Sequence, residues 1–249
     1  MTPAILHALA DARERRQLAI LLTRLSDGTQ RILIERKRQL APGIAGDNAA
    51  LDPKLQEAAE RAAQTGVSGN VVAEDAAWFV HAHVPPPRLI LVGAVHVAQA
   101  LAPMAAAVGM AVTIIDPRSG FATPERFPGI TLLDLWPDEA LATLAPDRYS
   151  AVVTLSHEAR LDDPALHAAL SGPAFYVGAL GSRKTQAARR ERLAAMGHDA
   201  DTLARMHGPV GLSIGAIGPQ EIALSILAEI VAVRRNAALG SQAPGNRTG

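Results

Sequence analysis

The chain has 249 residues, of which 49% are hydrophobic and 19% are charged, so it can bury the core of one large or two modest globular domains. Its 24 basic and 24 acidic residues leave no net charge, which argues against nucleic acid or an anionic membrane as a partner. The absence of cysteine excludes disulfides, thiolate metal sites, iron–sulfur clusters and a cysteine nucleophile, and it means that the protein cannot itself carry a persulfide.

No targeting or membrane segment is expected. Residues 1–16 become rich in basic residues towards their end and contain no long apolar core, unlike a signal peptide. Residues 89–115 contain no Asp, Glu, Lys or Arg and are long enough to span a bilayer. Polar residues, glycine and proline interrupt this run, however, and two buried strands with a half-buried helix explain it as well. We therefore predict a cytoplasmic protein without a membrane span.

Residues 1–84 predict a small α+β domain. A helix is expected over Ala4–Arg16, and a second helix begins at Asp52 and Pro53 and runs to Gln64. Asp27-Gly28 is a hairpin signal between two strand patterns, and two more strand patterns follow the second helix. The predicted strands are 18–25, 30–34, 70–73 and 77–84, and residues 41–48 are expected to form a loop. Pro85–Pro87 form a stiff linker that ends this domain.

His81 and His83 lie two residues apart on the last of these strands, so they share one face. Two imidazoles can begin a metal site, but no third ligand follows at local spacing. We expect a solvated or partner-facing strand and no metal site.

Residues 88–235 alternate strand and helix patterns, which predicts an α/β, doubly wound (Rossmann-like) parallel sheet in the strand order 3-2-1-4-5-6. The expected strands are 89–92, 111–115, 130–133, 151–155, 174–177 and 210–214. The expected helices are 97–108, 137–144, 164–170, 182–196, 202–206 and 219–235. Residues 236–249 are polar and rich in glycine, which predicts a disordered tail.

The first two of these strands form a βαβ unit of about 30 residues. The first strand stops at Gly93, and the second ends on Asp116, roughly 20 residues past the turn, where an acid can meet a ribose hydroxyl. The dinucleotide fingerprint requires three glycines, and the chain has Gly93, Val95 and Ala98 at these positions. A β-branched Val95 obstructs the approach of a pyrophosphate, so a domain that has lost or altered its ligand remains an alternative.

Ligands of doubly wound sheets bind beyond the carboxyl ends of the strands. The candidate cofactor-binding residues therefore follow the strands, and they are Gly93, Ala94, His96, Asp116, Arg118, His157, Gly178, Gly181, Ser182, Arg183, Lys184, Gly215 and Glu221.

The loop after the fifth strand is the best candidate for an anion site. Its glycines free the backbone, Ser182 can cap the next helix, and the helix N-terminus favours negative charge. Arg183 and Lys184 add positive charge. The alternative is an ordinary capped helix with solvated basic residues, since Arg189, Arg190 and Arg192 follow on the same helix.

No nucleophile–base–orienter triad is evident from spacing. His157 is the candidate acid–base group, because it follows the fourth strand at the expected ligand edge, but it can also merely leave the strand. His96 can touch a phosphate or only cap its helix, and Glu221 alone compensates a helix dipole. The catalytic residues stay unknown, and a binding protein is favoured over an enzyme.

Four segments together resemble the XdhC/CoxI family, and the resemblance covers residues 86–235. They are Gly93-Ala-Val-His-Val-Ala98, Ala151 to His157 with Leu161-Asp-Asp-Pro164, Tyr176-Val-Gly-Ala-Leu-Gly-Ser-Arg-Lys-Thr185, and Gly211 to Gly215 with Pro219 to Ile230.

The resemblance implies an accessory protein of molybdenum hydroxylases such as xanthine dehydrogenase. Such a protein binds molybdenum cofactor, as molybdopterin or its dinucleotide form, assists its sulfuration by a cysteine desulfurase, and passes it to the apo-enzyme. A homodimer is left open. Two alternatives remain from the residues alone. One is an NAD(P)-dependent oxidoreductase that uses Asp116 and His157, and the other is a non-catalytic nucleotide-binding protein that docks to its dehydrogenase.

Overall fold

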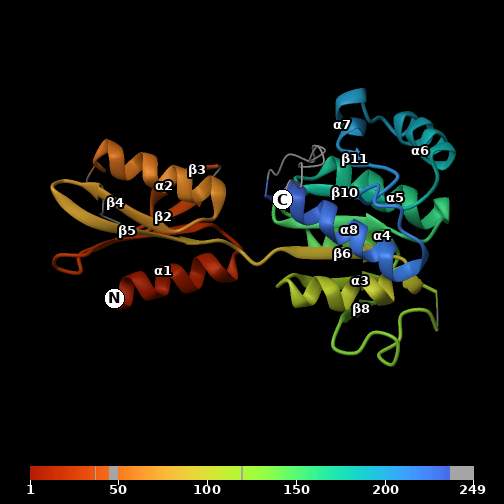
Figure 1. Cartoon of the computed structure of the whole chain (residues 1–249), viewed down its shortest axis with the longest axis horizontal. Helices are drawn as coiled ribbons and strands as arrows, with labels where there is room; N and C mark the ends of the chain where they lie inside the picture. The colour runs from red at the N-terminus through yellow and green to blue at the C-terminus, as the bar shows by residue number, and fades with distance from the viewer. Residues whose placement is uncertain (37, 45–49, 119, 236–249) are drawn as a thin grey trace, which may run out of the picture. The chain divides into compact units, whose positions relative to one another are not determined.

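The computed structural model describes residues 1–36, 38–44, 50–118 and 120–235. The chain divides into two compact units, Met1–Pro85 and Pro86–Gly249, and each is described by itself (Figure 1).

The first unit is an antiparallel sheet of five strands in the order β3-β2-β1-β5-β4. Its helices pack on opposite faces because successive residues of β1 alternate between two cores. Ile20 and Leu22 pack with Leu55 of α2, and Ala19 and Leu21 pack with Ile5 of α1. The elements are α1 (Pro3–Glu14), β1 (Ala19–Arg24), β2 (Gln30–Arg36), β3 (Gln39–Pro42), α2 (Pro53–Thr65), β4 (Gly69–Ala73) and β5 (Ala76–His83).

The predicted hairpin at Asp27-Gly28 and the capping of α2 by Asp52 are confirmed, since Asp52 accepts the Lys54 N–H at 2.8 Å. The loop expected over residues 41–48 is partly wrong, because Ala41 and Pro42 pair with β2. A proline is tolerated there because β3 is an edge strand. Residues 45–48 of that predicted loop lie outside the described residues.

The second unit is a parallel sheet of six strands in the order β11-β10-β9-β6-β7-β8, which confirms the predicted order 3-2-1-4-5-6. The strands are β6 (Arg88–Val92), β7 (Ala111–Ile115), β8 (Thr131–Leu133), β9 (Ser150–Thr154), β10 (Tyr176–Ala179) and β11 (Met206–His207). Both edge strands are short, with three residues in β8 and two in β11.

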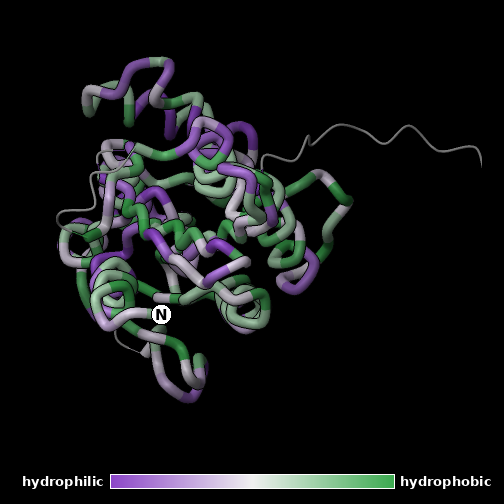
Figure 2. Tube along the Cα trace, turned by 90° about the vertical axis from the view of Figure 1, so that its left-hand side faces the viewer, coloured by the Kyte–Doolittle hydropathy of each residue, from purple (hydrophilic) through white to green (hydrophobic). Residues whose placement is uncertain are grey.

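Helices cover both faces of this sheet. The helices are α3 (His96–Ala107), α4 (Pro137–Leu144), α5 (Ala159–Ser171), α6 (Arg183–Ala195), α7 (Ala200–Ala204) and α8 (Gly218–Arg234). One core joins β-strand residues to α3 and α8, and a second joins the opposite strand faces to α4, α5 and α6. In Figure 2 hydrophobic and hydrophilic stretches alternate along the trace of the described residues. Within the described part of the chain, no helix combines the length and the apolar character needed to cross a bilayer.

The sixth strand was predicted in the wrong place. β11 is Met206–His207, so Met206 leaves the predicted helix 202–206, which is observed as α7. Residues 210–214 alternate like a strand but form none. The Val210 N–H donates to the Ala179 carbonyl of β10 at 3.1 Å, and the next two residues bond to α8. The Gly211 N–H donates to Glu229 at 2.8 Å, and the Leu212 N–H donates to the Ser225 carbonyl at 3.2 Å.

Candidate cofactor-binding site

Gly93 lies where the chain leaves β6 and turns into α3. A Cβ atom on Gly93 would come within 3.0 Å of the Ser156 backbone nitrogen, and its φ of +105° disfavours any other residue. The loops after β6 and β9 therefore touch at the point where the strand order reverses, which is where ligands of such sheets bind. Helix α3 begins at this point without a side-chain cap on its N-terminus.

The Asp116 carboxylate, which follows β7, hydrogen-bonds to the same loop. It is 1% exposed, and it accepts the Ala94 N–H at 2.8 Å, the Arg118 N–H at 3.0 Å and the Arg118 Nε–H at 2.8 Å. Burial raises the pKa of Asp116, but the hydrogen bonds from Arg118 and Ala94 outweigh it and hold that pKa below its ordinary value. Asp116 is thus engaged in hydrogen bonds within the protein.

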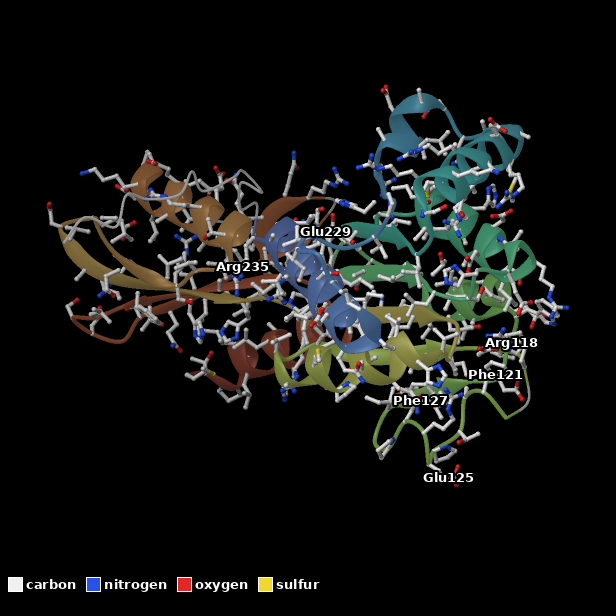
Figure 3. All side chains as sticks on the ribbon, turned by 45° about the vertical axis from the view of Figure 1, so that its right-hand side comes forward. Arg118, Phe121, Glu125, Phe127, Glu229 and Arg235 are labelled. Atoms are coloured by element: carbon white, nitrogen blue, oxygen red, sulfur yellow. The ribbon has the colours of Figure 1, made fainter. Side chains whose placement is uncertain are left out.

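Arg118 connects this loop to the one after β9. Its guanidinium pairs with Asp116 and with the Glu158 carboxylate, and it lies 4.2 Å from the centre of the Phe121 ring. Arg118 and Phe121 lie together at this edge in Figure 3. Glu158 was not among the predicted site residues. The one feature of the sequence that indicates it is its position directly after His157, past the end of a buried strand. Its partner is 40 residues away.

The loop after β10 is built differently from the prediction in one respect. Gly178 lies inside β10, where a Cβ would come within 2.7 Å of Val210, so this glycine serves packing and not a binding loop. Gly181 and Ser182 do form the turn into α6, and Ser182 Oγ accepts the Thr185 N–H at 3.2 Å. Arg183 and Lys184 are exposed in the first turn of this 13-residue helix.

A buried polar network links the β9 and β10 loops. Ser156 Oγ donates to Asp162 at 2.7 Å, Arg189 pairs with Asp162 at 2.9 Å, and Arg189 also donates to Gln186 Oε1 at 2.8 Å. Gln186 donates to the Ala179 carbonyl at 2.8 Å. Arg189 is 2% exposed, so the alternative of solvated basic residues on this helix does not hold for Arg189. Sequence reasoning missed the network because its polar side chains come from separate segments and show no local pattern.

The other candidates occupy separate positions. His96 is exposed in the first turn of α3, and His157 is exposed between Ser156 and Glu158 with a φ of +61°. Gly215 is exposed in the segment before α8. Glu221 accepts the Ile217 N–H at 2.7 Å, so it caps α8. The structure thus brings Gly93, Ala94, Asp116 and Arg118 together, and it adds Glu158 to them.

The imidazole rings of His81 and His83 lie 4.0 Å apart on β5. Among the residues that the structure describes, no group of three or more histidine or acidic side chains is placed to hold a metal ion.

Comparisons with known proteins agree with this architecture. A family model for the XdhC Rossmann domain matches residues 89–230. Over 162 residues the chain is 35% identical to a probable xanthine dehydrogenase subunit of Bacillus subtilis (strain 168), in a match that covers 65% of this chain and 47% of that protein. Over 150 residues it is 33% identical to the molybdenum cofactor insertion chaperone PaoD of Escherichia coli (strain K12), in a match that covers 60% of this chain and 41% of that protein.

A crystal structure described as a xanthine dehydrogenase from Bacillus halodurans has the same fold. The TM-score is 0.65 at 23% sequence identity, and the match covers 96% of this chain and 66% of that one. The chain spans less than half the length of the curated relatives it matches.

Proposed function

The chain belongs to the XdhC family, and from that membership we propose that it binds molybdenum cofactor and assists its insertion into a molybdenum hydroxylase of the xanthine dehydrogenase type. Two of the relatives carry names that fit this role, one a molybdenum cofactor insertion chaperone and the other a probable xanthine dehydrogenase subunit. The proposed role is that of a carrier, in line with the name of the relative PaoD.

The observation that carries the proposal is the first turn of α6. Its N–H groups, Arg183 and Lys184 form a cationic turn directly after β10, at the edge where doubly wound sheets bind ligands. Molybdopterin ends in a phosphate, and its dinucleotide form contains a diphosphate, so either form supplies an anion for this turn. When bound, the cofactor supplies the redox chemistry that the client enzyme uses. The residues of this chain hold it.

The sulfuration step is assigned to a partner. The chain contains no cysteine, so a cysteine desulfurase would have to bring the sulfur to the bound cofactor. The nicotinamide alternative is disfavoured, because the Asp116 carboxylate that would meet a ribose already accepts hydrogen bonds from Ala94 and Arg118.

The test is the molybdenum and pterin content of the chain purified after co-expression with the cofactor biosynthesis enzymes. We expect bound cofactor in the wild-type protein and its loss in the Arg183→Ala/Lys184→Ala double variant. The matched control is Arg190→Ala, an exposed basic residue further along the same helix. Neither molybdenum nor pterin in the wild-type protein would contradict the carrier role. Equal content in the double variant would instead move the site away from α6.

A further inference from the structure

The ion pair between Arg118 and Glu158 crosses the point where the strand order reverses. Arg118 follows β7 and Glu158 follows β9, and β6 lies between these two strands in the sheet. The pair therefore spans the carboxyl end of β6, where Gly93 and Ala94 lead into the uncapped N-terminus of α3. A ligand anion that approaches this helix meets protein carboxylates already in place.

The two carboxylates that hold Arg118 differ in how easily they can be replaced. Asp116 is fully buried as a side chain and is also fixed by the Ala94 N–H. Glu158 is 34% exposed, and its other partner is Arg160, which is 66% exposed and pairs with it at 2.8 Å. Exposed pairs of this kind contribute little to stability. Glu158 is thus the partner that a ligand can displace.

The contacts of Arg118 keep its guanidinium in place if a ligand replaces Glu158. Asp116 binds its Nε and Nη2, and the Phe121 ring lies 4.2 Å away, so the guanidinium keeps its position when Glu158 leaves. The Nη1 donor released by Glu158 then faces an incoming oxygen. A charge-assisted hydrogen bond from Nη1 suits a phosphate, whose charge of nearly two exceeds that of the carboxylate it replaces.

We propose that Glu158 is a specificity-determining gate, which occupies Arg118 until a phosphate or diphosphate group displaces it and which excludes ligands whose anion is a single carboxylate. The proposal rests on the proposed function, because it concerns the edge of the sheet at which the cofactor would bind. It assigns the second anion contact of that edge to Arg118, on the far side of β6 from the α6 turn.

The test is calorimetric titration of the full-length protein with inorganic pyrophosphate at low ionic strength. Glu158→Gln removes the competing charge and keeps the shape, and we expect it to raise the affinity about two- to fivefold, the worth of a partly exposed pair. Acetate should compete with pyrophosphate in Glu158→Gln but not in the wild-type protein. The matched control is Glu191→Gln, which changes the net charge equally at an exposed position of α6.

The double variant Glu158→Gln/Arg118→Gln identifies the cation that receives the ligand. If the double variant loses the increase in pyrophosphate affinity, Arg118 is the residue that receives the ligand. If the increase persists, Arg160 receives it and the proposal is overturned. An unchanged affinity in Glu158→Gln, an equal gain in Glu191→Gln, or no pyrophosphate binding to any of the proteins also overturns it. Since Glu158 is at the surface, its variant is expected to fold, and a thermal melt checks this.

The cofactor content of the purified protein separates this proposal from the proposed function. Bound cofactor without a Glu158 effect rejects the gate alone. A Glu158 effect in a protein that never carries cofactor supports the gate and rejects the carrier role.

Discussion

At the scale of single residues, Gly93 illustrates how a backbone position can be fixed by a neighbouring loop. Its φ of +105° is close to that of Gly197, which has a φ of +100°, but an added Cβ at Gly197 meets nothing within 4 Å. The two glycines therefore separate the effect of backbone strain from the effect of crowding.

We predict that Gly93→Ala lowers the free energy of unfolding by about 3 kcal/mol, from about 1–2 kcal/mol of left-handed strain and a further contribution from pushing the Ser156 backbone away. Gly197→Ala should cost only the strain, about 1–2 kcal/mol. Urea unfolding of both variants measures the difference. Equal losses would mean that the Gly93 and Ser156 loops separate without cost.

A second residue-scale prediction concerns His198 and His167. The Nδ1 atom of His167 lies 2.9 Å from Nε2 of His198, and burial, together with the nearby His167, lowers the pKa of His198. The unfolded state then binds a proton at a higher pH than the folded state does, so stability falls as pH drops through the ordinary histidine pKa, about 6.5, towards the folded value.

We expect the urea midpoint of the wild-type protein to fall between pH 7.5 and pH 5.5, and the fall to be smaller in His198→Asn. His83, whose pKa is lowered mainly by burial, contributes in the same direction. The urea midpoint of the variant is therefore still expected to fall somewhat with pH. Identical slopes in the two proteins would show that the histidine pair does not couple protonation to folding.

At the scale of elements, the ion pair of Arg189 and Asp162 joins α6 to α5 inside the sheet's covering layer. Burial raises the pKa of Asp162 despite its hydrogen bonds from Ser156 and Arg189. Removing one partner of a buried pair leaves an uncompensated charge, which costs about 3–5 kcal/mol.

We therefore predict that Arg189→Met destabilises the protein by about 3–5 kcal/mol at pH 8. The loss should shrink towards pH 5, because the folded state then binds a proton at Asp162 more tightly than the unfolded state does. The double variant Asp162→Asn/Arg189→Met removes the charge and should recover part of the stability at pH 8. A loss independent of pH would assign the effect to packing of the arginine stem.

The elements that could be predicted from sequence are those with a strong local pattern. The hydrophobic pattern from Leu89 to Asp116 is enough to predict a strand, a turn, a helix and a second strand. The alternating strand and helix patterns that follow predict the strand order. β11 could not be predicted, because a strand of two residues is too short to show a hydrophobic period, whereas residues 210–214 show such a period without forming a strand. The same limit applies to the candidate site. Its loops follow from strand ends, whereas Glu158 and Arg189 act through partners 40 and 27 residues away.

At the scale of the whole molecule, the chain consists of two units with separate cores, and they meet in the sequence at Pro85 and Pro86. The family match lies wholly within the second unit. We predict that a fragment of residues 86–235 folds by itself and binds pyrophosphate with the affinity of the full chain. Cooperative thermal unfolding and calorimetry of the fragment measure this, and a fragment that fails to unfold cooperatively would show that the first unit is needed for folding.

The parallel sheet ends on both sides in its shortest strands, β8 and β11. A strand of two or three residues presents few unpaired N–H and C=O groups, so it is a poor template for a foreign strand. Long exposed edges are the usual starting points for fibrillar assembly, and this sheet offers none of that length at either side. The unit is therefore expected to stay dispersed at high concentration even though its central strands are strongly apolar.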